Sequence, residues 1–335
     1  MATTLPRHAV PAADRLAEAF HASTGHVLDD ARIFRRKSDK LFVSAALKAG
    51  GDRVFVKYKA DDADGEIGQE FAALQRYSAA ADPSFGVSRP LSLIPDGQGG
   101  ASLVCEWHRL PSAATWLKLG MPVAAVRRRI MRMAAGWLRR YHEVGGLTER
   151  PLAEALDQAS FTARFERLVG ASPLVDRSGW PDHAAVLARA FALHGAAPVR
   201  HSVLHGDFTP SNLLVGVART IGYDFMARER GAVLADVGRF HSVGMWYGQL
   251  GLRSRRGQNY VADCRYFMDH YDVGGFRHGM PAVLLFQLDA LLDRVEDLTG
   301  KIAAPDAKKT ATSRRNLAMV TPVIRHLVEA LGEGA

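Results

Sequence analysis

Residues 201–225, HSVLHGDFTPSNLLVGVARTIGYDF, place polar residues at fixed intervals between short apolar segments. An apolar strand runs into His-Gly-Asp, an Asn follows that Asp by five residues, and a second strand delivers another Asp twelve residues later. NLLV and TIGYDF are expected to pair as a hairpin that turns at Gly216. Such a hairpin would bring Asp224 back beside Asn212. The segment therefore predicts a small antiparallel element that gathers the side chains of Asp207, Asn212 and Asp224.

These three side chains offer two carboxylates and one amide oxygen, the kinds of ligand that magnesium prefers. A phosphoryl group that leaves a nucleotide spreads negative charge over several oxygens. Its site must therefore hold magnesium and direct an acceptor oxygen in line. Pro210 and Ser211 bend the loop between Asp207 and Asn212, so both side chains could point into one cavity. The pattern indicates a metal-nucleotide phosphotransfer site.

The first hundred residues change from helical to strand periodicity. Apolar positions at helical spacing predict an amphipathic helix over residues 12–23. The period then shifts toward two, which indicates antiparallel strands joined by the turns KSDK and GGD. A second helix is expected to pack on this sheet. The expected strands are 31–36, 41–49, 53–59, 88–96 and 101–107, and the second helix is 65–80.

From residue 108 the composition shifts toward helices. An apolar stripe predicts a helix over 123–146 that stops at Gly145 and Gly146, where a left-handed C-cap costs glycine little. His142, near the end of this helix, is expected to pack or to act as a C-cap. Further helices are expected over 153–170, 182–195, 258–272, 280–299 and 312–332.

The length of the chain favours more than one core. At 335 residues it exceeds the size at which a single hydrophobic core stops growing, so two lobes are expected. The two compositions predict an α+β protein, with an N-terminal antiparallel sheet carrying one packed helix and a mostly helical C-terminal lobe. The expected division is into residues 1–107 and 108–335.

Composition and charge exclude several other classes of protein. The longest apolar runs are interrupted and fall short of the roughly 20 residues that span a membrane. The N-terminal residues do not resemble a signal peptide, so a cytoplasmic location is expected. The net charge of +8 fits either an anionic partner or a solvated arginine-rich surface. No nucleic-acid-binding motif is present, and Cys105 and Cys264 are expected to be reduced, packed thiols.

The opening segment resembles the aminoglycoside phosphotransferase and choline kinase-like family, whose members are relatives of the protein kinases. HGDFTPSN matches the family's His-Gly-Asp-x-x-x-x-Asn loop, and GYDF matches its Gly-x-Asp-Phe segment. The resemblance implies a two-lobed protein-kinase-like fold, with Asp207 as catalytic base and Asn212 and Asp224 as magnesium ligands. It also implies that His205 braces the loop and that Asp236, in LADVGRF, is structural.

The same resemblance extends upstream to the expected third strand. Kinases of this type need a strand lysine that pairs with the α- and β-phosphates, and a helix glutamate that holds this lysine. RVFVKYK offers Lys57, and the following helix offers Glu70 thirteen residues later. Lys59 and Glu66 are the rival assignments. Glu70 is preferred because it precedes FAAL, which is similar to the family's Glu-x-x-x-Leu helix.

Two further nucleotide contacts follow from the resemblance. ASLVCEWHRLP looks like the link between lobes, where backbone groups near Glu106 and His108 would meet the adenine edge. The Gly-x-Gly-x-x-Gly loop of protein kinases is absent, and FRRKSDKLF stands in its place. Ser38 and nearby backbone amides are candidates for phosphate contacts there, with Arg36 and Lys37 as additional charges.

A small-molecule acceptor is favoured over a protein. Gly206 occupies the position of the arginine in the His-Arg-Asp motif of protein kinases, and the interval from Asp224 to Asp236 is too short for an activation loop with a peptide platform. The resemblance thus implies a phosphotransferase that uses ATP, or GTP, with Mg²⁺. The γ-phosphoryl group would pass to a hydroxyl of an aminoglycoside, sugar, amino alcohol or similar molecule, and residues 1–107 would bind the nucleotide.

The acceptor stays open, although residues 108–335 are expected to bind it. Residues 241–335 carry twelve Lys and Arg against ten Asp and Glu, so no acidic excess indicates a polycationic acceptor. The loop from Arg253 to Arg256 would suit an anionic one. An aromatic cage for choline is a further possibility. Its candidates are Trp246, Tyr247, Tyr260, Tyr266, Phe267 and Tyr271. A catalytically silent nucleotide- or ligand-binding module on the same fold is the alternative function, and the oligomeric state is not predicted.

Overall fold

The computed structural model divides into two compact units. The N-terminal unit comprises Met1–Leu110 and Gly216–Ala227, and the C-terminal unit comprises Pro111–Val215 and Arg228–Ala335. Within them, the structure describes residues 10–37, 40–47, 53–82, 84–119, 124–178, 180–225, 229–247, 256–272, 279–303 and 307–334.

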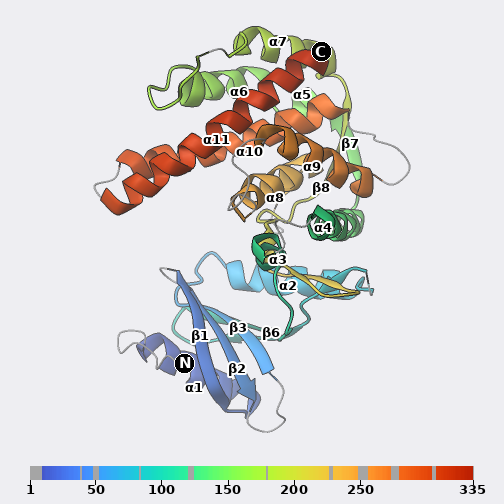
Figure 1. The fold of residues 1–335 in the computed structure, drawn as a ribbon. Helices are drawn as coiled ribbons and strands as arrows, with labels where there is room; N and C mark the ends of the chain where they lie inside the picture. The colour runs from blue at the N-terminus through green and yellow to red at the C-terminus, as the bar shows by residue number, and fades with distance from the viewer. Residues whose placement is uncertain are drawn as a thin grey trace. The chain divides into compact units, whose positions relative to one another are not determined.

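The N-terminal unit is built on a five-stranded sheet in which neighbouring strands are antiparallel (Figure 1). The strand order is β1-β2-β3-β6-β5. These strands are β1 (Leu28–Lys37), β2 (Lys40–Leu47), β3 (Arg53–Lys59), β5 (Pro90–Pro95) and β6 (Ala101–Glu106). The unit also contains α1 (Val10–Thr24), α2 (Glu66–Ser78), β4 (Gly86–Val87) and β10 (Thr220–Gly222), and β10 runs parallel to β4. The two helices and five strands predicted for this part of the chain are confirmed.

The alternation of side chains along β3 divides its residues between two environments. One face joins α1 in an apolar cluster. This cluster consists of Leu16, Phe20, Val54, Val56, Tyr58, Ile94 and Val104. Because successive side chains of a strand point to opposite faces, Lys57 and Lys59 lie on the other face, toward α2. The period-two pattern of RVFVKYK thus sends two lysines away from the α1 cluster.

The C-terminal unit consists mainly of helices around a small sheet. In this sheet β8 (Pro198–Val203) lies between β7 (Thr148–Pro151) and β11 (Arg230–Ala232), and both pairings are antiparallel. The longer helices are α4 (Ala124–Gly145), α7 (His183–His194), α8 (Val233–Tyr247), α9 (Arg256–Tyr271), α10 (Met280–Ala303) and α11 (Ala307–Gly334). The shorter elements are α3 (Ala113–Leu119), α5 (Leu152–Ala155), α6 (Gln158–Phe165), a π-helical turn (Glu166–Gly170), a 3₁₀ turn (Pro210–Asn212) and β9 (Leu213–Val215).

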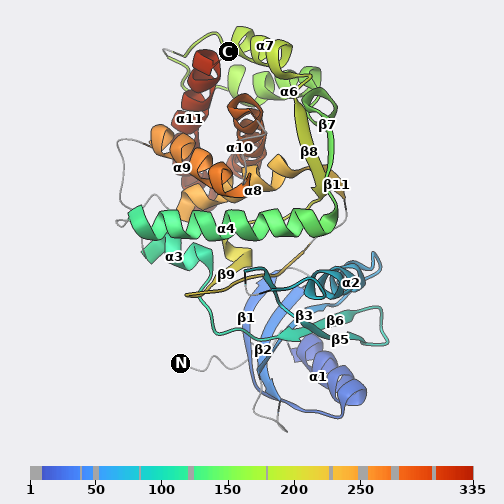
Figure 2. The same cartoon turned by 90° about the vertical axis from the view of Figure 1, so that its right-hand side faces the viewer.

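Helix α10 provides much of the core of this unit, and α4 packs against α9 (Figure 2). Eleven side chains of α10 are buried, including all six of its leucines. Ile130, Trp137 and Tyr141 of the predicted α4 stripe are buried as well. The helix expected over 153–170 is wrong as one continuous helix. Leu156 adopts extended geometry and the Asp157 side chain caps α6 by accepting from Ser160 N–H, so the segment divides.

Helix α8 was not predicted from its sequence, VLADVGRFHSVGMWY. Glycine and valine give it weak intrinsic helix propensity. Its close packing on α10 explains why it forms: a Cβ atom placed on Gly238 would lie 2.7 Å from the carbonyl oxygen of Phe286. Only glycine allows this approach of the two helices, so tertiary packing stabilises a segment whose local preference is low.

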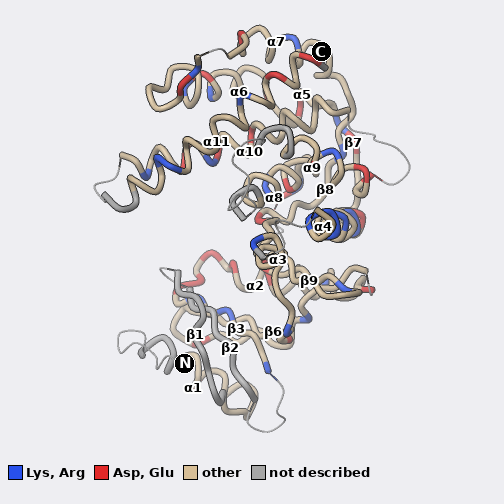
Figure 3. Tube along the Cα trace, in the orientation of Figure 1, with Lys and Arg blue, Asp and Glu red and all other residues tan. Residues whose placement is uncertain are grey.

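The arginines of α4 and the two cysteines lie in opposite environments. Figure 3 shows arginines gathered on α4, of which Arg128, Arg129 and Arg132 are exposed. Cys105 and Cys264 are both free and buried. None of the helices in the described part of the chain has the length and apolar character required to span a bilayer.

Candidate active site

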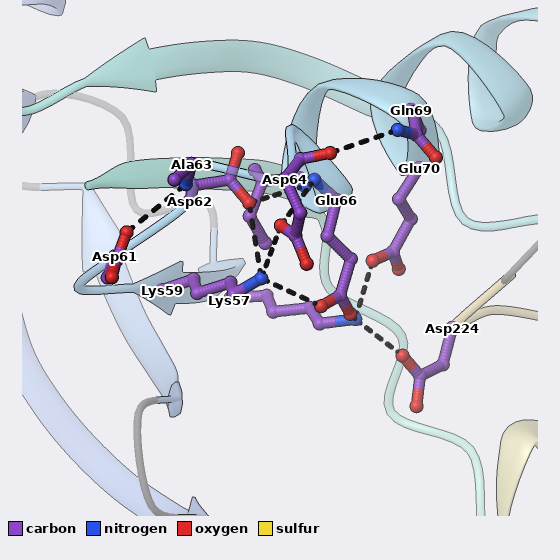
Figure 4. A network of polar contacts seen from close by, with 11 residues as sticks. Lys57, Lys59, Asp61, Asp62, Ala63, Asp64, Glu66, Gln69, Glu70 and Asp224 are labelled. Carbon is purple, nitrogen blue, oxygen red and sulfur yellow. Dashed lines mark hydrogen bonds and ion pairs between the residues drawn. The ribbon is translucent and has the colours of Figure 1, made fainter. Parts of the chain in front are cut away.

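A buried lysine on β3 of the N-terminal unit has two carboxylate partners, one on α2 and one after β10 (Figure 4). Lys57 Nζ is 2.5 Å from Glu70 Oε2 and 2.6 Å from Asp224 Oδ1. The side chains of Lys57 and Glu70 are 4% and 5% exposed, and that of Asp224 is 22% exposed. Residues far apart in sequence therefore place two acidic groups on one ammonium group.

The local structure explains how each of these three side chains is positioned. Lys57 lies on a central strand, with β2 and β6 as neighbours. Glu70 is on the buried face of α2. Asp224 follows β10 and has φ 62°, a left-handed conformation that Asp tolerates better than most residues. On either side of it, Tyr223 packs edge-on against Phe55 and Phe225 against Tyr77. These contacts anchor the segment to the N-terminal unit.

The electrostatic surroundings keep Lys57 positively charged. Burial by itself lowers the pKa of this ammonium group, because it loses contact with water. The charges and hydrogen bonds of Glu70 and Asp224 more than offset that effect, so the pKa of Lys57 lies above its ordinary value. The site thus holds a permanent cation.

Lys59, the rival lysine, has a separate set of carboxylate partners. It lies on the same face as Lys57, and its Nζ is 2.5 Å from Asp64 Oδ1 and 3.1 Å from Glu66 Oε2. Asp62 Oδ1 is 3.7 Å away. Figure 4 shows this cluster around the loop that precedes α2. Glu66 Oε1 also lies 4.0 Å from Lys57 Nζ, so Glu66 links the two lysines.

In the C-terminal unit, the loop after β8 holds Asp207 by both carboxylate oxygens. Asn212 Nδ2 donates to Asp207 Oδ2 at 3.0 Å and to the Asp207 carbonyl at 2.9 Å. Arg239 contacts the other oxygen, Oδ1, through Nε and Nη2, each at 3.0 Å. The Asp207 side chain remains 36% exposed. A carboxylate in a fixed orientation is thus accessible to a ligand.

A buried carboxylate supports the backbone of this loop. Asp236 Oδ2 accepts from His205 N–H at 2.8 Å and Oδ1 accepts from Gly206 N–H at 3.0 Å. His142 Nε2 lies 3.0 Å from Asp236 Oδ2, and its Nδ1 lies 2.7 Å from Tyr271 Oη. Burial alone would raise the pKa of Asp236, but His142, His205 and the backbone hydrogen bond hold it below its ordinary value. Asp236 is therefore an ionised support for the loop.

His205 is fully buried among aromatic rings. Its imidazole packs against Trp137, Tyr141 and Phe208, with ring centroids between 5.5 and 5.9 Å apart. This packing holds the residue that precedes Gly206 and Asp207, as expected for a brace. Gly206 has φ 79°, which glycine adopts without strain and which turns the chain toward Asp207.

The side chains of Asn212 and Asp224 each offer oxygen atoms of the kind that magnesium binds. Within the described part of the chain, the Asn212 side chain makes its two hydrogen bonds through Nδ2, which leaves Oδ1 as the potential metal ligand. Asp224 adds a partly exposed carboxylate. No group of three or more His, Cys, Asp or Glu among the described residues could hold a metal ion. Magnesium is commonly bound by one or two carboxylates together with phosphate oxygens and water.

The other residues predicted to contact the nucleotide are Glu106, His108 and Ser38. Glu106 N–H donates to the Arg89 carbonyl at 3.0 Å and the Glu106 carbonyl accepts from Ser88 Oγ at 3.1 Å, so both backbone groups are engaged within the protein. His108 is half-buried, and its Nε2 is a buried atom with no hydrogen-bond partner among the described residues. Burial lowers the pKa of His108. Ser38 lies outside the described residues, and the side chains of Arg36 and Lys37 are not described.

The residues considered for acceptor binding lie in several environments. Of the aromatic residues considered for a cage, Tyr260, Phe267 and Tyr271 belong to the core. The ring of Tyr266 packs at a tilt against that of His270 on the same helix. The side chains of Trp246 and Tyr247 are not described, and most of the loop from Arg253 to Arg256 lies outside the described residues.

Arg239 and the partners of Asp236 were not recognised from the sequence. Arg239 lies three residues after Asp236 in LADVGRF, and the signal that could have identified it is this spacing, which places both side chains on one helix face. His142 and Tyr271 carry no comparable signal, because their contacts join α4, α8 and α9. Their proximity depends on helix packing.

Comparison with known proteins agrees with this architecture. No curated protein matched the sequence. Among solved structures, a choline/ethanolamine kinase family protein from Mesorhizobium loti is 15% identical, with a TM-score of 0.56 and coverage of 96% of this chain and 99% of that one. A thermostable mutant of aminoglycoside phosphotransferase APH(4)-Ia, in ternary complex with AMP-PNP and hygromycin B, is 11% identical. Its TM-score is 0.53, with coverage of 92% and 98%. Both show the kinase-like fold.

A family model provides the assignment. The model of the phosphotransferase enzyme family, APH, matches residues 36–261, which is more than half of the chain. The matched span includes Lys57 with its carboxylate partners and the loop that carries Asp207 and Asn212. The chain therefore belongs to the phosphotransferase enzyme family and has its two-lobed, kinase-like α+β fold.

Proposed function

We propose that this protein transfers the γ-phosphoryl group of ATP, with magnesium, to a hydroxyl group of a small molecule. GTP is the other candidate donor, and the proposed location is the cytoplasm, where these nucleotides are abundant. The observation that carries the proposal is the ammonium group of Lys57 between the carboxylates of Glu70 and Asp224, at 2.5 and 2.6 Å. It is supported by the kinase-like fold and the family assignment.

Each residue of this trio has a role in the proposal. Lys57 would bind the α- and β-phosphates, since a buried cation attracts phosphate oxygens strongly. Glu70 would hold Lys57 in place. Asp224 would exchange its contact with Lys57 for magnesium when the nucleotide binds, and Asn212 would supply a second ligand. Magnesium would neutralise charge on the phosphate oxygens. Residues 1–107 are the proposed nucleotide-binding part, and residues 108–335 the catalytic and acceptor-binding part.

The Asp207 carboxylate is held by Asn212 and Arg239, yet its side chain is 36% exposed and is therefore accessible to an acceptor. In the proposed step, an acceptor hydroxyl oxygen forms a bond to the γ-phosphorus atom, and the bond from that phosphorus to the β,γ-bridging oxygen breaks. The electron pair of the broken bond stays with the departing nucleoside diphosphate. The hydroxyl proton passes to Asp207. Its contact with Asn212 and Arg239 supports this role because the carboxylate is oriented before substrate arrives.

The buried Nε2 of His108 supports a place for the nucleobase. A buried polar atom without a partner among the described residues is uncommon and costs free energy. The lowered pKa of His108 keeps the ring neutral near pH 7, so it could exchange one hydrogen bond with a base edge. The engaged backbone of Glu106 makes this side chain, and the link residues after it, better candidates than Glu106 for that contact.

A cavity of about 180 Å³ in the C-terminal unit supports a small acceptor. It adjoins the loop at Gly206, and its lining includes Arg239, Asp289 and Asp293. Charges of both signs favour a polar acceptor, whether a sugar, an amino alcohol or an anionic molecule. The structure of APH(4)-Ia with AMP-PNP and hygromycin B offers a precedent for a nucleotide and a small acceptor on this fold.

The test uses Asp207→Asn. Asn keeps the shape of the side chain and can still hydrogen-bond, but it cannot take up the proton. Removal of a general base commonly lowers the rate by about 10²- to 10⁴-fold. Phosphoryl transfer from ATP with magnesium, measured over a panel of aminoglycosides, sugars and amino alcohols, should therefore collapse. Stabilisation by an ATP analogue should change little, because the variant retains Lys57 and Asp224.

The result also separates this proposal from a catalytically silent binding module. Such a module would be stabilised by nucleotide, yet wild-type protein would phosphorylate no member of the panel. Equal turnover by wild type and Asp207→Asn would remove Asp207 from the role of base. Loss of nucleotide stabilisation in Lys57→Ala, with retention in Lys59→Ala, would support the assignment of the nucleotide site.

A further inference from the structure

Arg239 and Asn212 hold the Asp207 carboxylate from two sides. Arg239 Nε and Nη2 both lie 3.0 Å from Asp207 Oδ1, while Asn212 Nδ2 lies 3.0 Å from Oδ2. An aspartate side chain has two rotatable bonds. One donor group on each oxygen restricts both of them. Asn212 belongs to the same loop as Asp207, whereas Arg239 comes from α8.

We propose that Arg239 is a positioning residue, which acts on phosphoryl transfer by fixing the orientation of the Asp207 carboxylate. The inference rests on the proposed function, in which Asp207 is the base. Proton acceptance requires that a carboxylate oxygen point toward the acceptor hydroxyl. Arg239 holds Oδ1 through two N–H groups, so rotation of the carboxylate requires that both contacts break.

One turn of α8 supports both the backbone and the side chain of the loop. Asp236 accepts hydrogen bonds from the backbone N–H groups of His205 and Gly206. Arg239, three residues later on the same helix face, contacts the next residue of the loop, Asp207. Close packing at Gly238 sets the position of α8 on α10. The helix thus provides a rigid support for two consecutive parts of the loop.

The exposure of the pair argues against a role in stability alone. The side chains of Arg239 and Asp207 are 45% and 36% exposed. Ion pairs that are this accessible are screened by water and contribute little to folding. Two other carboxylates that line the cavity, Asp289 and Asp293, already bind Arg164 at 3.0 and 2.5 Å. Arg239 therefore pairs with Asp207, and the effect of this ion pair is to orient the Asp207 carboxylate.

The experiment compares Arg239→Ala and Arg239→Lys with a matched control, Arg325→Ala. Arg325 is 43% exposed and pairs with Glu329 at 2.7 Å on α11, so it matches Arg239 in type, exposure and pairing. A misplacement on the scale of an ångström can lower turnover by about 10²-fold. We expect a fall of that order in kcat for Arg239→Ala, with KM for ATP and the melting shift induced by an ATP analogue unchanged. Arg239→Lys should recover part of kcat because it restores one charged donor.

A double-mutant cycle shows whether Arg239 acts through Asp207. Transfer is measured in single-turnover reactions with γ-labelled ATP and magnesium, using the best acceptor of the panel and, in parallel, water. Once Asp207→Asn has removed the base, the further change Arg239→Ala should have little effect, because residues that act as a unit are not additive. An equal loss from Arg239→Ala in both backgrounds would overturn the proposal. So would a kcat for Arg239→Ala that equals that of Arg325→Ala.

Failure of this inference is distinguishable from failure of the proposed function. If wild type transfers phosphate and Asp207→Asn does not, the proposed function stands and the Arg239 variants decide the inference. If wild type transfers phosphate to neither the panel nor water, the proposed function fails, and the role of Arg239 in transfer fails with it.

Discussion

Replacement of Lys57 by methionine should destabilise the protein and should extend its loss of stability with rising pH to higher pH, because the pKa of Glu70, already raised to about 7, would rise further. Methionine keeps a long apolar side chain but removes the ammonium group. Lys57 and Glu70 are 4% and 5% exposed, so Glu70 would remain as a buried carboxylate without its cation. Removal of one partner from a buried ion pair typically costs about 3–5 kcal/mol. We expect a loss of that size in the free energy of unfolding at neutral pH.

The sign of the pH dependence follows from Glu70. Burial raises the pKa of Glu70 and the nearby Lys57 lowers it, so loss of Lys57 raises it further. In the unfolded chain the pKa of Glu70 is about 4.3. Below that pH its carboxyl group is protonated in both the folded and the unfolded state, so burial of the group carries no ionisation penalty. As pH rises above that value, the unfolded chain releases the proton while the folded protein retains it. Stability is then lost with rising pH until the folded pKa is passed, by about 1.4 kcal/mol for each unit of pKa difference.

Urea unfolding, followed by circular dichroism over a pH series, measures this effect. The deficit of Lys57→Met relative to wild type should be smaller near pH 5 than near pH 8. The double variant Lys57→Met, Glu70→Gln is the control, since the neutral amide removes the buried charge and should recover much of the lost stability. A single variant as stable as wild type at every pH, or a double variant no more stable than the single one, would refute the reasoning.

Three further predictions concern the C-terminal unit. Asp236→Ala should lower the free energy of unfolding by several kcal/mol in urea titrations, because each buried N–H group left unsatisfied costs about 1–3 kcal/mol. A destabilisation below that of a typical surface substitution would contradict this. Gly238→Ala should lower the melting temperature, since its Cβ would lie 2.7 Å from the Phe286 carbonyl oxygen, whereas Gly136→Ala, with nothing within 4 Å, should raise it slightly. Equal shifts for the two would be evidence against the packing argument. Burial lowers the pKa of His241 to about 3. Between about pH 6.5 and pH 3 the unfolded chain therefore binds a proton at His241 that the folded protein does not, so stability falls as the pH is lowered over that range. His241→Phe should weaken this acid sensitivity in calorimetry, and an unchanged pH profile would reject it.

Much of the fold follows from local sequence patterns. Period-two alternation in RVFVKYK and the apolar stripe of residues 123–146 each report which face of an element is buried, because burial is periodic along a strand or helix. The Asp207 to Asn212 loop is also local. Its five-residue spacing allows the Asn212 side chain to donate to both the carboxylate and the backbone carbonyl of Asp207. Motif and periodicity therefore sufficed to indicate the fold class and to nominate this loop.

Local sequence patterns did not predict helix α8. Its glycines and valines disfavour a helix locally, and its stability comes from close contact with α10 at Gly238. The division of the segment after β7 into α5 and α6 likewise depends on one cap, Asp157, within a sequence whose apolar spacing reads as continuous. Local propensity is a weak preference, and packing between distant segments overrides it.

The partners of the polar side chains were decided by tertiary structure as well. Sequence alone left Lys59 as a rival of Lys57, because both point to the same face of β3. Because α2 lies across that face, Glu70 forms its ion pair with Lys57, and Glu66 forms its shorter one with Lys59. Arg239 reaches Asp207 only because β8 and β11 are neighbours and α8 continues from β11. Hydrogen bonds and ion pairs require contact within a few ångströms, and a linear spacing does not specify contact between elements whose register and packing are set by the rest of the fold.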